Sequence, residues 1–520
     1  MQRASSAWLF VGLATLSLTA CGGGGGGGAT GAIPPIGGQS NAASGPPQNG
    51  FASPSNPITA ATPEAIMPPS SPAPAGAPLS VASLGGYQGN TYVAHHSGDS
   101  YEYSEDVAVT FNKPLNTSAF TYTITPSTPS SVYFWNYGRT PAITFRKTPG
   151  VVYTITIPVG TPAADGTILN APYSFTISTP ANPQIPAPIR STRGEPYRYG
   201  VLEHPFPFSL SGPTAQQQIN LLAQAGVRFV RIDYCGSQIE PNQGQFDFST
   251  LDSIMDQLVA KGITELPIVE QYCAPTWATG GHGYPAIWQQ PSDYAAFAGA
   301  IAAHVAQKYP TITRMELFNE PNLGGWWTNP NPQYAARDGS ATAVYMRAAY
   351  AAIKQAMPSM TVVGPALSDG GGMVTDPRKF LQTLYNSGCR VGVCWDVLSV
   401  HNYRWYNPTF YTSSSYMNQW GIYQQLQQIA VQNGDPMPHV MLTEWGFSND
   451  PTSPVGFDPA VQARYVALGF NLMLSDPTVD GIVYVNLYNP GTDFWGRTSL
   501  TDTSFGLLPG FSVYQQFATF

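Results

Sequence analysis

The chain has 520 residues, with 22 Lys and Arg against 30 Asp and Glu, and a net charge of −8 at pH 7. Only 10% of its residues are charged, and 12% are aromatic, whereas a typical soluble domain carries about 25% charged residues. A nucleic-acid-binding role is excluded because no cluster of Lys and Arg offers the phosphate contacts that such binding needs. Past the N-terminus no apolar run reaches about 18 residues, which excludes a polytopic membrane protein. A surface with little charge and many aromatic side chains suits a neutral or weakly polar ligand.

Residues 1–20 have the pattern of an export signal. Arg3 supplies a positive start, residues 7–18 are apolar, and the small Ala20 precedes Cys21. The last four residues, Leu-Thr-Ala-Cys at 18–21, resemble the lipobox of bacterial lipoproteins, in which the signal is cut before a cysteine that is then acylated. This resemblance implies an exported chain, anchored through lipid on Cys21 to the periplasmic side or outer surface of a bacterial membrane. The alternative is that the apolar stretch itself is a short membrane anchor.

Residues 21–84 form a second compositional segment. They are rich in Gly, Pro, Ala and Ser, and Glu64 is their only charged side chain. Such a composition cannot bury enough apolar surface to offset the entropy of ordering the chain. We therefore expect a disordered tether, flexible where it is rich in Gly and more extended where it is rich in Pro.

Residues 85–185 contain short runs of alternating polar and apolar residues, separated by turn residues, a pattern typical of a β-sandwich. The expected strands lie within 106–112, 120–126, 131–137, 142–147, 151–158 and 173–180. The stretches 107–116 and 153–169 resemble the bacterial Ig-like modules of surface proteins. We interpret this module as a spacer, and a carbohydrate-binding role stays open, although no aromatic platform stands out in the sequence.

A Pro-rich linker spans residues 186–196, and from 197 to 520 apolar strand patterns alternate with helical ones. The expected strands are 197–202, 227–234, 263–272, 312–319, 360–367, 395–403, 439–446 and 480–488, and the clearest helices are 215–226, 251–262, 294–309, 341–357 and 459–474. Eight apolar strands, each followed by a crossover, predict an α/β fold, a (β/α)8 TIM barrel preceded by the small β-sandwich. A doubly wound open sheet would have similar periodicity, but no GxGxxG fingerprint follows a strand.

Two glutamates stand at the ends of expected barrel strands, where reactive groups of such barrels lie. The fourth strand leads into Glu320 and the seventh ends at Glu444. Burying an unpaired carboxylate is costly, so a single Glu in this position would be explained by pairing with an Arg or by capping the next helix. Two of them facing one barrel mouth favour chemistry instead. Glycosidic cleavage needs such a pair, one as general acid and one as nucleophile or base.

The motifs around these glutamates, FNEP at 318–321 and TEWG at 443–446, resemble the signatures of clan A of the glycoside hydrolases, retaining enzymes on (β/α)8 barrels. The resemblance covers roughly residues 197–510, with both motifs on the expected strands in the right order. It implies that Glu320 is the general acid/base, that Glu444 is the nucleophile, and that Asn319 hydrogen-bonds the sugar 2-hydroxyl. We expect no metal and no cofactor.

Three more positions match that clan. Arg231, near the end of the second strand, matches an Arg that keeps the nucleophile ionised, since a nearby cation favours a carboxylate. His401 and Tyr403, on the sixth strand, match residues that contact the two catalytic carboxylates. The alternative for this pair is a hydrogen-bonded His and a packed Tyr at the barrel mouth.

The chain departs from the clan at strand eight, which usually ends in a Trp below the sugar. Here the sequence has Asn486 and Tyr488 as candidates for this position, and Trp495 follows seven residues after Tyr488. Flat aromatic faces bind the CH surfaces of sugars, and each ring could equally be packing. The other aromatic candidates after strand ends are Trp277, Trp326, Trp327, Trp405, Tyr406 and Trp445, and His204 is a weaker candidate for the cleft.

Three segments narrow the resemblance: residues 238–263, residues 274–278 and the sixth strand are similar to family 39-like members of the clan. That group includes β-xylosidases and hydrolases of secreted bacterial exopolysaccharide. We therefore expect a retaining β-glycosidase that cleaves internal linkages of a neutral polysaccharide. The alternatives are an exo-acting β-xylosidase, a family 5-like endoglucanase, and a carbohydrate-binding surface protein that has lost activity.

Four cysteines remain after Cys21, and an even number in an exported protein favours disulfides. Cys389 and Cys394 would close a short loop. Cys235 and Cys273 each follow an apolar strand, so they could join the same ends of neighbouring strands. A zinc site is the competing interpretation, but the paired CxxC and His spacings of such sites are absent from the sequence.

Overall fold

The computed structural model describes residues 76–89, 91–202, 214–282, 287–324, 327–368, 375–403, 408, 421–489, 491 and 494–520. The predicted signal peptide, the lipidation site Cys21 and most of the predicted tether lie outside these residues. So do His204, Trp326, Trp405, Tyr406 and the side chain of Trp495.

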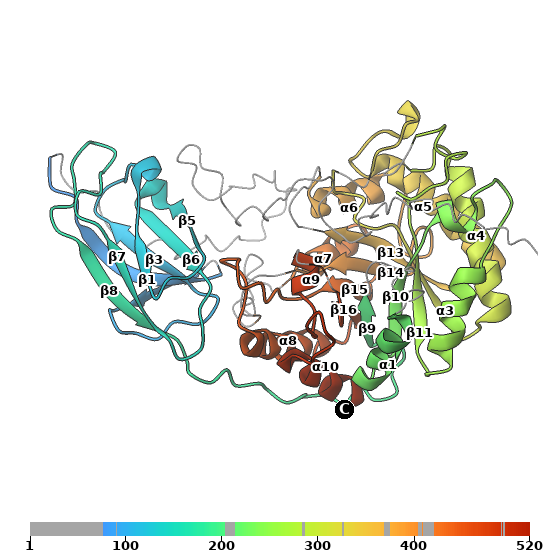
Figure 1. Ribbon diagram of the computed structural model, residues 1–520. Helices are drawn as coiled ribbons and strands as arrows, with labels where there is room; N and C mark the ends of the chain where they lie inside the picture. The colour runs from blue at the N-terminus through green and yellow to red at the C-terminus, as the bar shows by residue number, and fades with distance from the viewer. Residues whose placement is uncertain are drawn as a thin grey trace, which may run out of the picture.

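The N-terminal unit is a sandwich of two antiparallel sheets, with strand orders β2-β1-β3-β6-β5 and β4-β7-β8 (Figure 1). Its strands are β1 (Val81–Gln88), β2 (Thr91–His95), β3 (Asp106–Phe111), β4 (Thr123–Thr125), β5 (Ser130–Trp135), β6 (Thr140–Phe145), β7 (Val152–Ile157) and β8 (Tyr173–Ser178), with two short 3-10 turns, η1 (Thr117–Ala119) and η2 (Asn136–Gly138). The six predicted strands match β3 to β8. Strands β1 and β2 were not predicted, and the folded unit begins at about Val81 rather than at residue 85.

The C-terminal unit is a closed barrel of eight parallel strands in the order β10-β11-β12-β13-β14-β15-β16-β9. The strands are β9 (Tyr199–Leu202), β10 (Phe229–Tyr234), β11 (Thr264–Val269), β12 (Arg314–Leu317), β13 (Thr361–Ser368), β14 (Val397–His401), β15 (Val440–Trp445) and β16 (Val479–Val485). All eight predicted strands are confirmed, and the open doubly wound sheet is contradicted because β16 pairs with β9.

Helices surround the barrel (Figure 1). They are α1 (Ala215–Ala225), α2 (Gly236–Ile239), α3 (Ser249–Val259), α4 (Pro291–Lys308), α5 (Ser340–Ala356), α6 (Pro377–Asn386), α7 (Tyr423–Gln432), α8 (Pro459–Leu474), α9 (Phe494–Arg497) and α10 (Pro509–Thr519), with a 3-10 turn, η4 (Pro332–Tyr334). Within the described part of the chain, no helix combines the length and the hydropathy needed to cross a membrane.

The barrel interior is apolar in one layer and charged nearer the carboxyl ends of the strands. Its apolar layer contains Phe229, Leu266, Val363, Met441 and Val483, one from each of five strands. Because side chains alternate along a strand, every second residue continues inward. On β10 the residues two and four positions after the apolar one are an Arg and an Asp, both buried. The carboxyl ends of the strands therefore carry the charged groups into the barrel.

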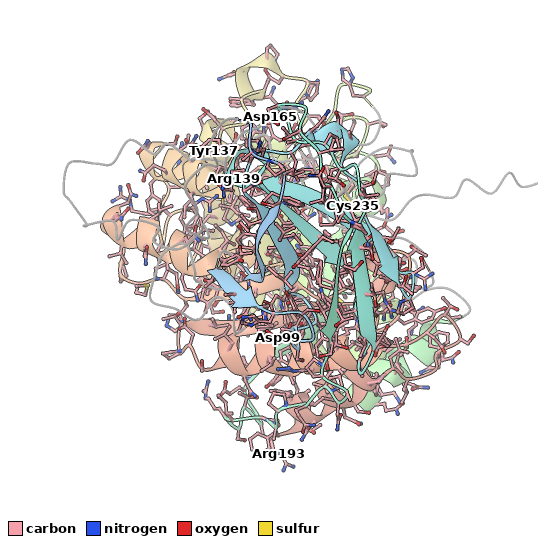
Figure 2. All side chains as sticks on the ribbon, turned by 90° about the vertical axis from the view of Figure 1, so that its left-hand side faces the viewer. Asp99, Tyr137, Arg139, Asp165, Arg193 and Cys235 are labelled. Atoms are coloured by element: carbon pink, nitrogen blue, oxygen red, sulfur yellow. A yellow bond between two sulfur atoms is a disulfide. The ribbon has the colours of Figure 1, made fainter. Side chains whose placement is uncertain are left out.

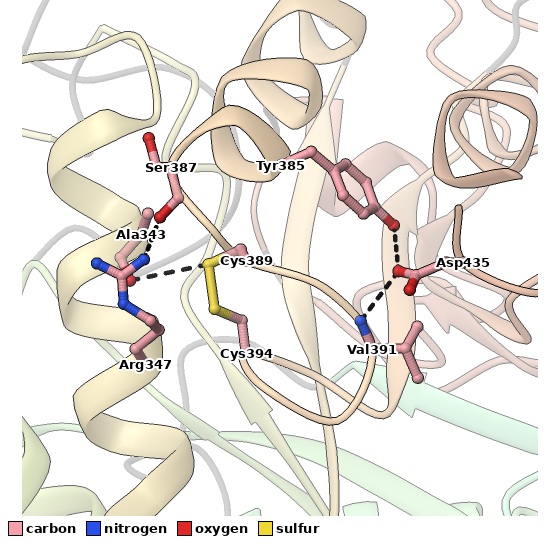
Figure 3. The surroundings of a disulfide bond; sticks show 8 residues. All are labelled: Ala343, Arg347, Tyr385, Ser387, Cys389, Val391, Cys394 and Asp435. Atoms are coloured by element: carbon pink, nitrogen blue, oxygen red, sulfur yellow. Dashed lines mark hydrogen bonds between the residues drawn. A yellow bond between two sulfur atoms is a disulfide. The ribbon is translucent and has the colours of Figure 1, made fainter. Parts of the chain in front are cut away.

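Both predicted disulfides are present. Cys235 joins Cys273 across the ends of β10 and β11, and Cys389 joins Cys394 after α6. The second disulfide closes a short loop (Figure 3). Asp435, which follows α7, stabilises this loop because its carboxylate accepts a hydrogen bond from the Val391 amide at 3.0 Å.

Removing the two disulfides should have unequal effects on stability. Their cysteines are 38 and 5 residues apart, and a longer closed loop restricts the unfolded chain more. We expect the Cys235→Ala/Cys273→Ala chain to lose about 3–4 kcal/mol of unfolding free energy, and the Cys389→Ala/Cys394→Ala chain about 2 kcal/mol. Urea unfolding of the two variants and the parent chain checks this, and a larger loss for the Cys389/Cys394 pair would contradict it.

The sandwich and the barrel are joined by more than the linker. The β15–α8 loop reaches the sandwich, and its residues Pro454–Phe457 line a cavity of about 20 Å³ together with sandwich residues that include Ser131 and Thr144. On α8, the Tyr465 hydroxyl donates to Glu102 at 2.5 Å. The sandwich is therefore placed against a loop that leaves the carboxyl end of a barrel strand.

The linker also lies against the barrel. The Ile189 amide donates to the Asn471 side chain at 3.0 Å, and Asn471 donates to the Ala187 carbonyl at 2.9 Å. The Ser191 hydroxyl donates to the carbonyl oxygen of the C-terminal Phe520 at 2.6 Å. These contacts restrict the motion of the sandwich relative to the barrel.

Candidate active site

Glu320 and Glu444 meet at the carboxyl end of the barrel. Glu320 follows β12, Glu444 lies in β15, and they are 2% and 0% exposed. One carboxylate oxygen of each, together with a ring nitrogen of His401, forms a set of atoms that all lie within 4.8 Å of one another. Retaining glycosidases have carboxyl groups about 5–5.5 Å apart, whereas inverting enzymes leave about 6.5–9.5 Å for a water molecule. The contact between one oxygen of each carboxylate places the two groups close enough to act on the same bond.

Three side chains hold the carboxylate of Glu444. Arg231 Nη1 donates to Oε1 at 2.9 Å, and the Tyr403 hydroxyl donates to Oε2 at 2.9 Å. His401 Nδ1 lies 3.4 Å from the same Oε2. Burial raises the pKa of Glu444 above its usual value, and the charges of His401 and Arg231 offset only part of this rise. Arg231 itself stays protonated, because its acidic neighbours raise its pKa despite burial.

Glu320 has a different environment. Its Oε1 lies 2.7 Å from His401 Nδ1, while no described residue hydrogen-bonds its buried Oε2. Glu320 adopts a φ of +45°, and its backbone amide donates to the Ala366 carbonyl at 3.1 Å. A left-handed φ is unfavourable for a non-glycine residue and persists where the surrounding structure imposes it. The oxygen without a partner can carry a proton toward a leaving group.

Asn319 is fixed through both its backbone and its side chain. Its amide donates to Gln271 Oε1 at 2.9 Å, and Gln271 Nε2 donates to the Asn319 carbonyl at 2.7 Å. The Asn319 side-chain oxygen accepts from Arg231 Nη2 at 3.1 Å. Arg231 therefore orients Asn319 and Glu444 together. Gln271 was not predicted from the sequence, because its only signal there is a polar residue directly after an apolar strand.

A further set of buried acids surrounds Arg231. Its Nε donates to Glu316 Oε2 at 2.6 Å. Asp233 and Glu270, at the ends of neighbouring strands, are both buried, and their carboxyl groups interact electrostatically. Burial raises the pKa of Asp233 to about 7 and raises that of Glu270 as well. Two carboxyl groups in such contact share a proton, since both cannot ionise together at low cost. The sequence signal for this set is charge inside continuous apolar strands.

The raised pKa of Asp233 predicts how stability depends on pH. In the unfolded chain an Asp titrates near pH 3.9, and in the folded chain Asp233 titrates at about pH 7. The folded state therefore binds more protons between these values, so its stability falls as pH rises from about 4 to about 7. Asp233→Asn removes this titration, and we expect its unfolding free energy to fall less over that window.

Urea unfolding of the parent chain and Asp233→Asn at pH 5 and pH 8 measures the effect. Asp247→Asn is the matched control, because Asp247 is exposed and its hydrogen bonds to Ser249 lower its pKa. The control should follow the parent chain over this range. Parallel losses of stability in the parent and Asp233→Asn would contradict the assignment.

The structure corrects two of the aromatic candidates. Trp445 and Trp327 are both 0% exposed. Trp445 packs against Phe470 of α8 at a ring distance of 5.1 Å, and Trp327 packs against Tyr345 of α5 at 5.5 Å. Both rings belong to the layer between strands and helices, so neither is available to a sugar. The residue after an inward-facing one on a strand points outward, and Trp445 directly follows Glu444.

Two other predicted aromatics have packing partners as well. Trp277 is partly buried, donates from Nε1 to the Glu240 carbonyl at 3.0 Å, and lies edge-on to Trp288. Tyr488 is 8% exposed and stacks on Phe505 at 3.8 Å. At the end of β16 the peptide bond between Val485 and Asn486 is cis, and Asn486 is buried. Among the residues that the structure describes, the end of β16 therefore carries Asn486 and Tyr488.

Glu320, His401 and Glu444 have the donor types and spacing that could also hold a metal ion. Both oxygens of Glu444 already accept hydrogen bonds, one of them from the guanidinium of Arg231. A second cation beside that guanidinium would be repelled at short range. The donor set therefore fits proton transfer and nucleophilic attack better than metal binding.

The family model for glycoside hydrolase family 42, described as beta-galactosidase, matches residues 206–314. A beta-xylosidase from Geobacillus stearothermophilus is 27% identical over 243 residues, which cover 43% of this chain and 45% of that protein. The beta-galactosidase LacZ from Heyndrickxia coagulans is 26% identical over 125 residues, 20% of this chain and 19% of that protein. This chain is similar to glycoside hydrolases. It spans less than half the length of these two relatives.

Two solved structures also share similarity with this chain. A family 39 glycoside hydrolase from Bacteroides cellulosilyticus WH2 covers 82% of this chain and 81% of its own, with a TM-score of 0.46 and 18% identity. A family 39 beta-xylosidase from Caulobacter crescentus covers 64% of this chain and 72% of its own, with a TM-score of 0.45 and 20% identity.

Proposed function

We propose that this chain is a retaining β-glycosidase that cleaves internal linkages of a neutral polysaccharide by double displacement. The observation that carries the proposal is the close approach of Glu320 and Glu444 at the barrel mouth. One carboxylate oxygen of Glu320 lies within 4.8 Å of one carboxylate oxygen of Glu444. Their unequal surroundings support two different roles. Both oxygens of Glu444 accept hydrogen bonds, from Arg231 and Tyr403, whereas Glu320 has an oxygen free of described partners.

In the first step Glu320 donates its proton to the glycosidic oxygen while Glu444 attacks the anomeric carbon. The bond from that carbon to the leaving oxygen breaks, and a glycosyl ester of Glu444 forms. In the second step Glu320, now a carboxylate, takes a proton from water, and the resulting hydroxide attacks the same carbon and releases Glu444. His401, close to both carboxylates, would assist the change of protonation between the steps.

A neutral substrate is supported by the low charge of the chain and by the pairing of the charges in the site. Arg231, the cation beside the carboxylates, is engaged by Glu316, Asn319 and Glu444 and is 1% exposed. It is therefore not available to bind an anionic sugar. Cleavage of internal linkages follows from the proposed resemblance to exopolysaccharide hydrolases. The runner-up is an exo-acting β-xylosidase or a family 5-like endoglucanase, and one relative is a beta-xylosidase.

The test is a screen of the purified chain against aryl β-xyloside, β-glucoside and β-galactoside and against xylan, β-glucan and β-galactan. Proton NMR of the first product should show the β-anomer before mutarotation, and size analysis should show a rapid fall in chain length from internal cleavage. An α-anomer would contradict retention, and monosaccharide as the first product would favour the exo-acting alternative. Binding without any cleavage would favour the inactive carbohydrate-binding protein.

We also propose that lipid on Cys21 anchors the enzyme to a bacterial membrane, with residues 22–80 as the tether. The support is the signal and lipobox pattern of residues 1–21. Cys21→Ser should move the chain from the membrane fraction to the soluble fraction of an expressing bacterium, because acylation needs the thiol. The aryl-glycosidase activity of the released chain should be unchanged. Retention of Cys21→Ser in the membrane fraction would support the alternative of a membrane anchor in residues 7–18.

A further inference from the structure

The five-stranded sheet of the sandwich has an aromatic outer face. Its inner face packs into the sandwich core through residues such as Val107, Val109 and Ile143. The outer face holds a separate cluster made of Tyr87 on β1, Tyr92 on β2, and Tyr133 and Trp135 on β5. We call these four residues the aromatic face. The sequence did not reveal it, because two of the four rings lie on the unpredicted strands β1 and β2.

The four rings form one continuous layer. Tyr87 and Tyr92 are directly opposite each other in the β1–β2 pair, with ring centroids 5.6 Å apart. Tyr87 also lies 5.8 Å from Trp135, across the two strands between them, and Trp135 lies 5.5 Å from Tyr133. Tyr87 is buried in the middle of the layer, while the other three rings are partly exposed.

Small residues beneath the rings allow them to approach the sheet. Gly85, Ala108 and Ala142 are paired in one row across β1, β3 and β6. A Cβ on Gly85 would lie only 2.4 Å from the ring and hydroxyl of Tyr92, so the Tyr92 ring rests directly on the backbone of β1. An aromatic ring lying on a sheet keeps one flat face for a ligand, which is how sugar CH surfaces are bound.

The aromatic face presents no exposed charge to a ligand among the described residues. Asp106, its acidic residue, is 1% exposed and accepts from the hydroxyls of Tyr133 and Thr144. The indole nitrogen of Trp135 is buried, so the part of this side chain that a ligand can reach is its apolar ring. Aromatic rings without an exposed charge suit an uncharged carbohydrate and offer nothing to an ionic ligand.

The same sheet face adjoins the barrel loop that begins just after Glu444. Ser131 and Thr144, on the outer side of β5 and β6, line the cavity shared with Pro454–Phe457 of the β15–α8 loop. Strands β5 and β6 lie on the side of the sandwich nearer the barrel, and β7 and β8 lie on the far side (Figure 1). The aromatic face is thus continuous with a loop of the catalytic end of the barrel.

We propose that the aromatic face is a second carbohydrate-binding site, which holds a neutral polysaccharide while the barrel cleaves it. This inference rests on the proposed function for the class of its ligand. It replaces the interpretation of the sandwich as a spacer. Two linked sites for one polymer bind it more tightly than either site alone, provided that both can engage at once.

The test uses the full chain made inactive by Glu320→Gln, so that the polymer stays intact. Binding to xylan, β-glucan and β-galactan is measured by retardation in gels that contain each polymer. We add Trp135→Ala or Tyr92→Ala to the Glu320→Gln chain and compare binding to the polymer that retards the Glu320→Gln chain. We expect this binding to weaken at least about tenfold, since one of two linked sites is lost. Trp135→Phe keeps a flat ring and should retain most of the binding, which separates a binding role from a folding defect.

The matched control is Tyr137→Asn. Tyr137 is 67% exposed, it is not part of the cluster, and it lies at the end of the sandwich opposite Asp99 (Figure 2). Asn tolerates the φ of +53° at this position. This chain should bind as the Glu320→Gln chain does.

Three results would overturn the inference: no binding of the Glu320→Gln chain to any of the three polymers, unchanged binding by folded Trp135→Ala and Tyr92→Ala chains, or a change in sedimentation of those chains in place of a change in binding. The last would identify the face as a contact between protein chains. Hydrolysis of an aryl β-glycoside by Trp135→Ala with Glu320 intact should equal that of the parent. Absence of that hydrolysis in the parent chain itself would overturn the proposed function separately, while the binding assay would still report on the face.

Discussion

Replacing Glu444 by glutamine is expected to lower kcat for every β-glycoside substrate by about 10⁴-fold or more, the scale seen when a covalent nucleophile is removed. The amide cannot form the glycosyl ester, and no other described carboxylate lies as close to Glu320 and His401. Steady-state hydrolysis of an aryl β-glycoside measures the loss. Circular dichroism and thermal unfolding establish that the variant is folded.

The matched control for this variant is Glu265→Gln. Glu265 is also a buried glutamate on a barrel strand, but it hydrogen-bonds Tyr234, which packs in the layer between strands and helices. Burial raises the pKa of Glu265 to about 8, so near neutral pH an amide is a close replacement. Its activity should stay near that of the parent. Activity of Glu444→Gln comparable to that of Glu265→Gln would contradict the role of Glu444 as nucleophile.

Replacing Glu320 by glutamine should have an effect that depends on the leaving group. General acid catalysis contributes about 10²–10⁴-fold, and a sugar hydroxyl leaves poorly without a proton. We therefore expect polysaccharide cleavage to fall by about this factor. A dinitrophenyl β-glycoside needs no proton on its leaving group, so it should still form the glycosyl ester of Glu444 and release a burst of dinitrophenol.

The second step offers an independent check on Glu320. In Glu320→Ala the general base is missing, and azide, which needs no base, can enter the space and attack the anomeric carbon of the glycosyl ester. The products are the β-glycosyl azide and free Glu444, so turnover of the dinitrophenyl glycoside should rise with azide concentration. No rise with azide, together with an equal loss for good and poor leaving groups, would contradict the acid/base role.

The fold could be predicted largely from the periodicity of apolar residues. The eight barrel strands are buried on both sides and read as continuous apolar runs, and six sandwich strands show simple alternation. Strand β1 was not predicted, because Gly85 and Gly86 interrupt its alternation of polar and apolar residues. Those glycines are required by close contacts with Tyr92 and Glu105, which depend on strand pairing and cannot be read from local sequence.

The candidate site could be predicted in part. The residues with motif signatures, Glu320, Glu444 and Asn319, meet at the carboxyl end of the barrel with Arg231 and His401. Gln271 and Asp233 carry no such signature, and their importance comes from partners on other strands. The prediction that Trp445 could line the cleft was wrong, because a sequence motif does not reveal which of two consecutive residues points into the barrel.

The central claim is that Glu444 forms a covalent glycosyl ester. The most direct measurement uses a dinitrophenyl 2-deoxy-2-fluoro-β-glycoside of the sugar selected by the aryl-glycoside screen. The fluorine slows the second step, so the intermediate accumulates and can be located by mass spectrometry of a proteolytic digest. We predict time-dependent inactivation with one sugar per chain, attached to Glu444 and absent from Glu444→Gln. An active enzyme that gains no adduct, or gains it on another residue, would contradict the account.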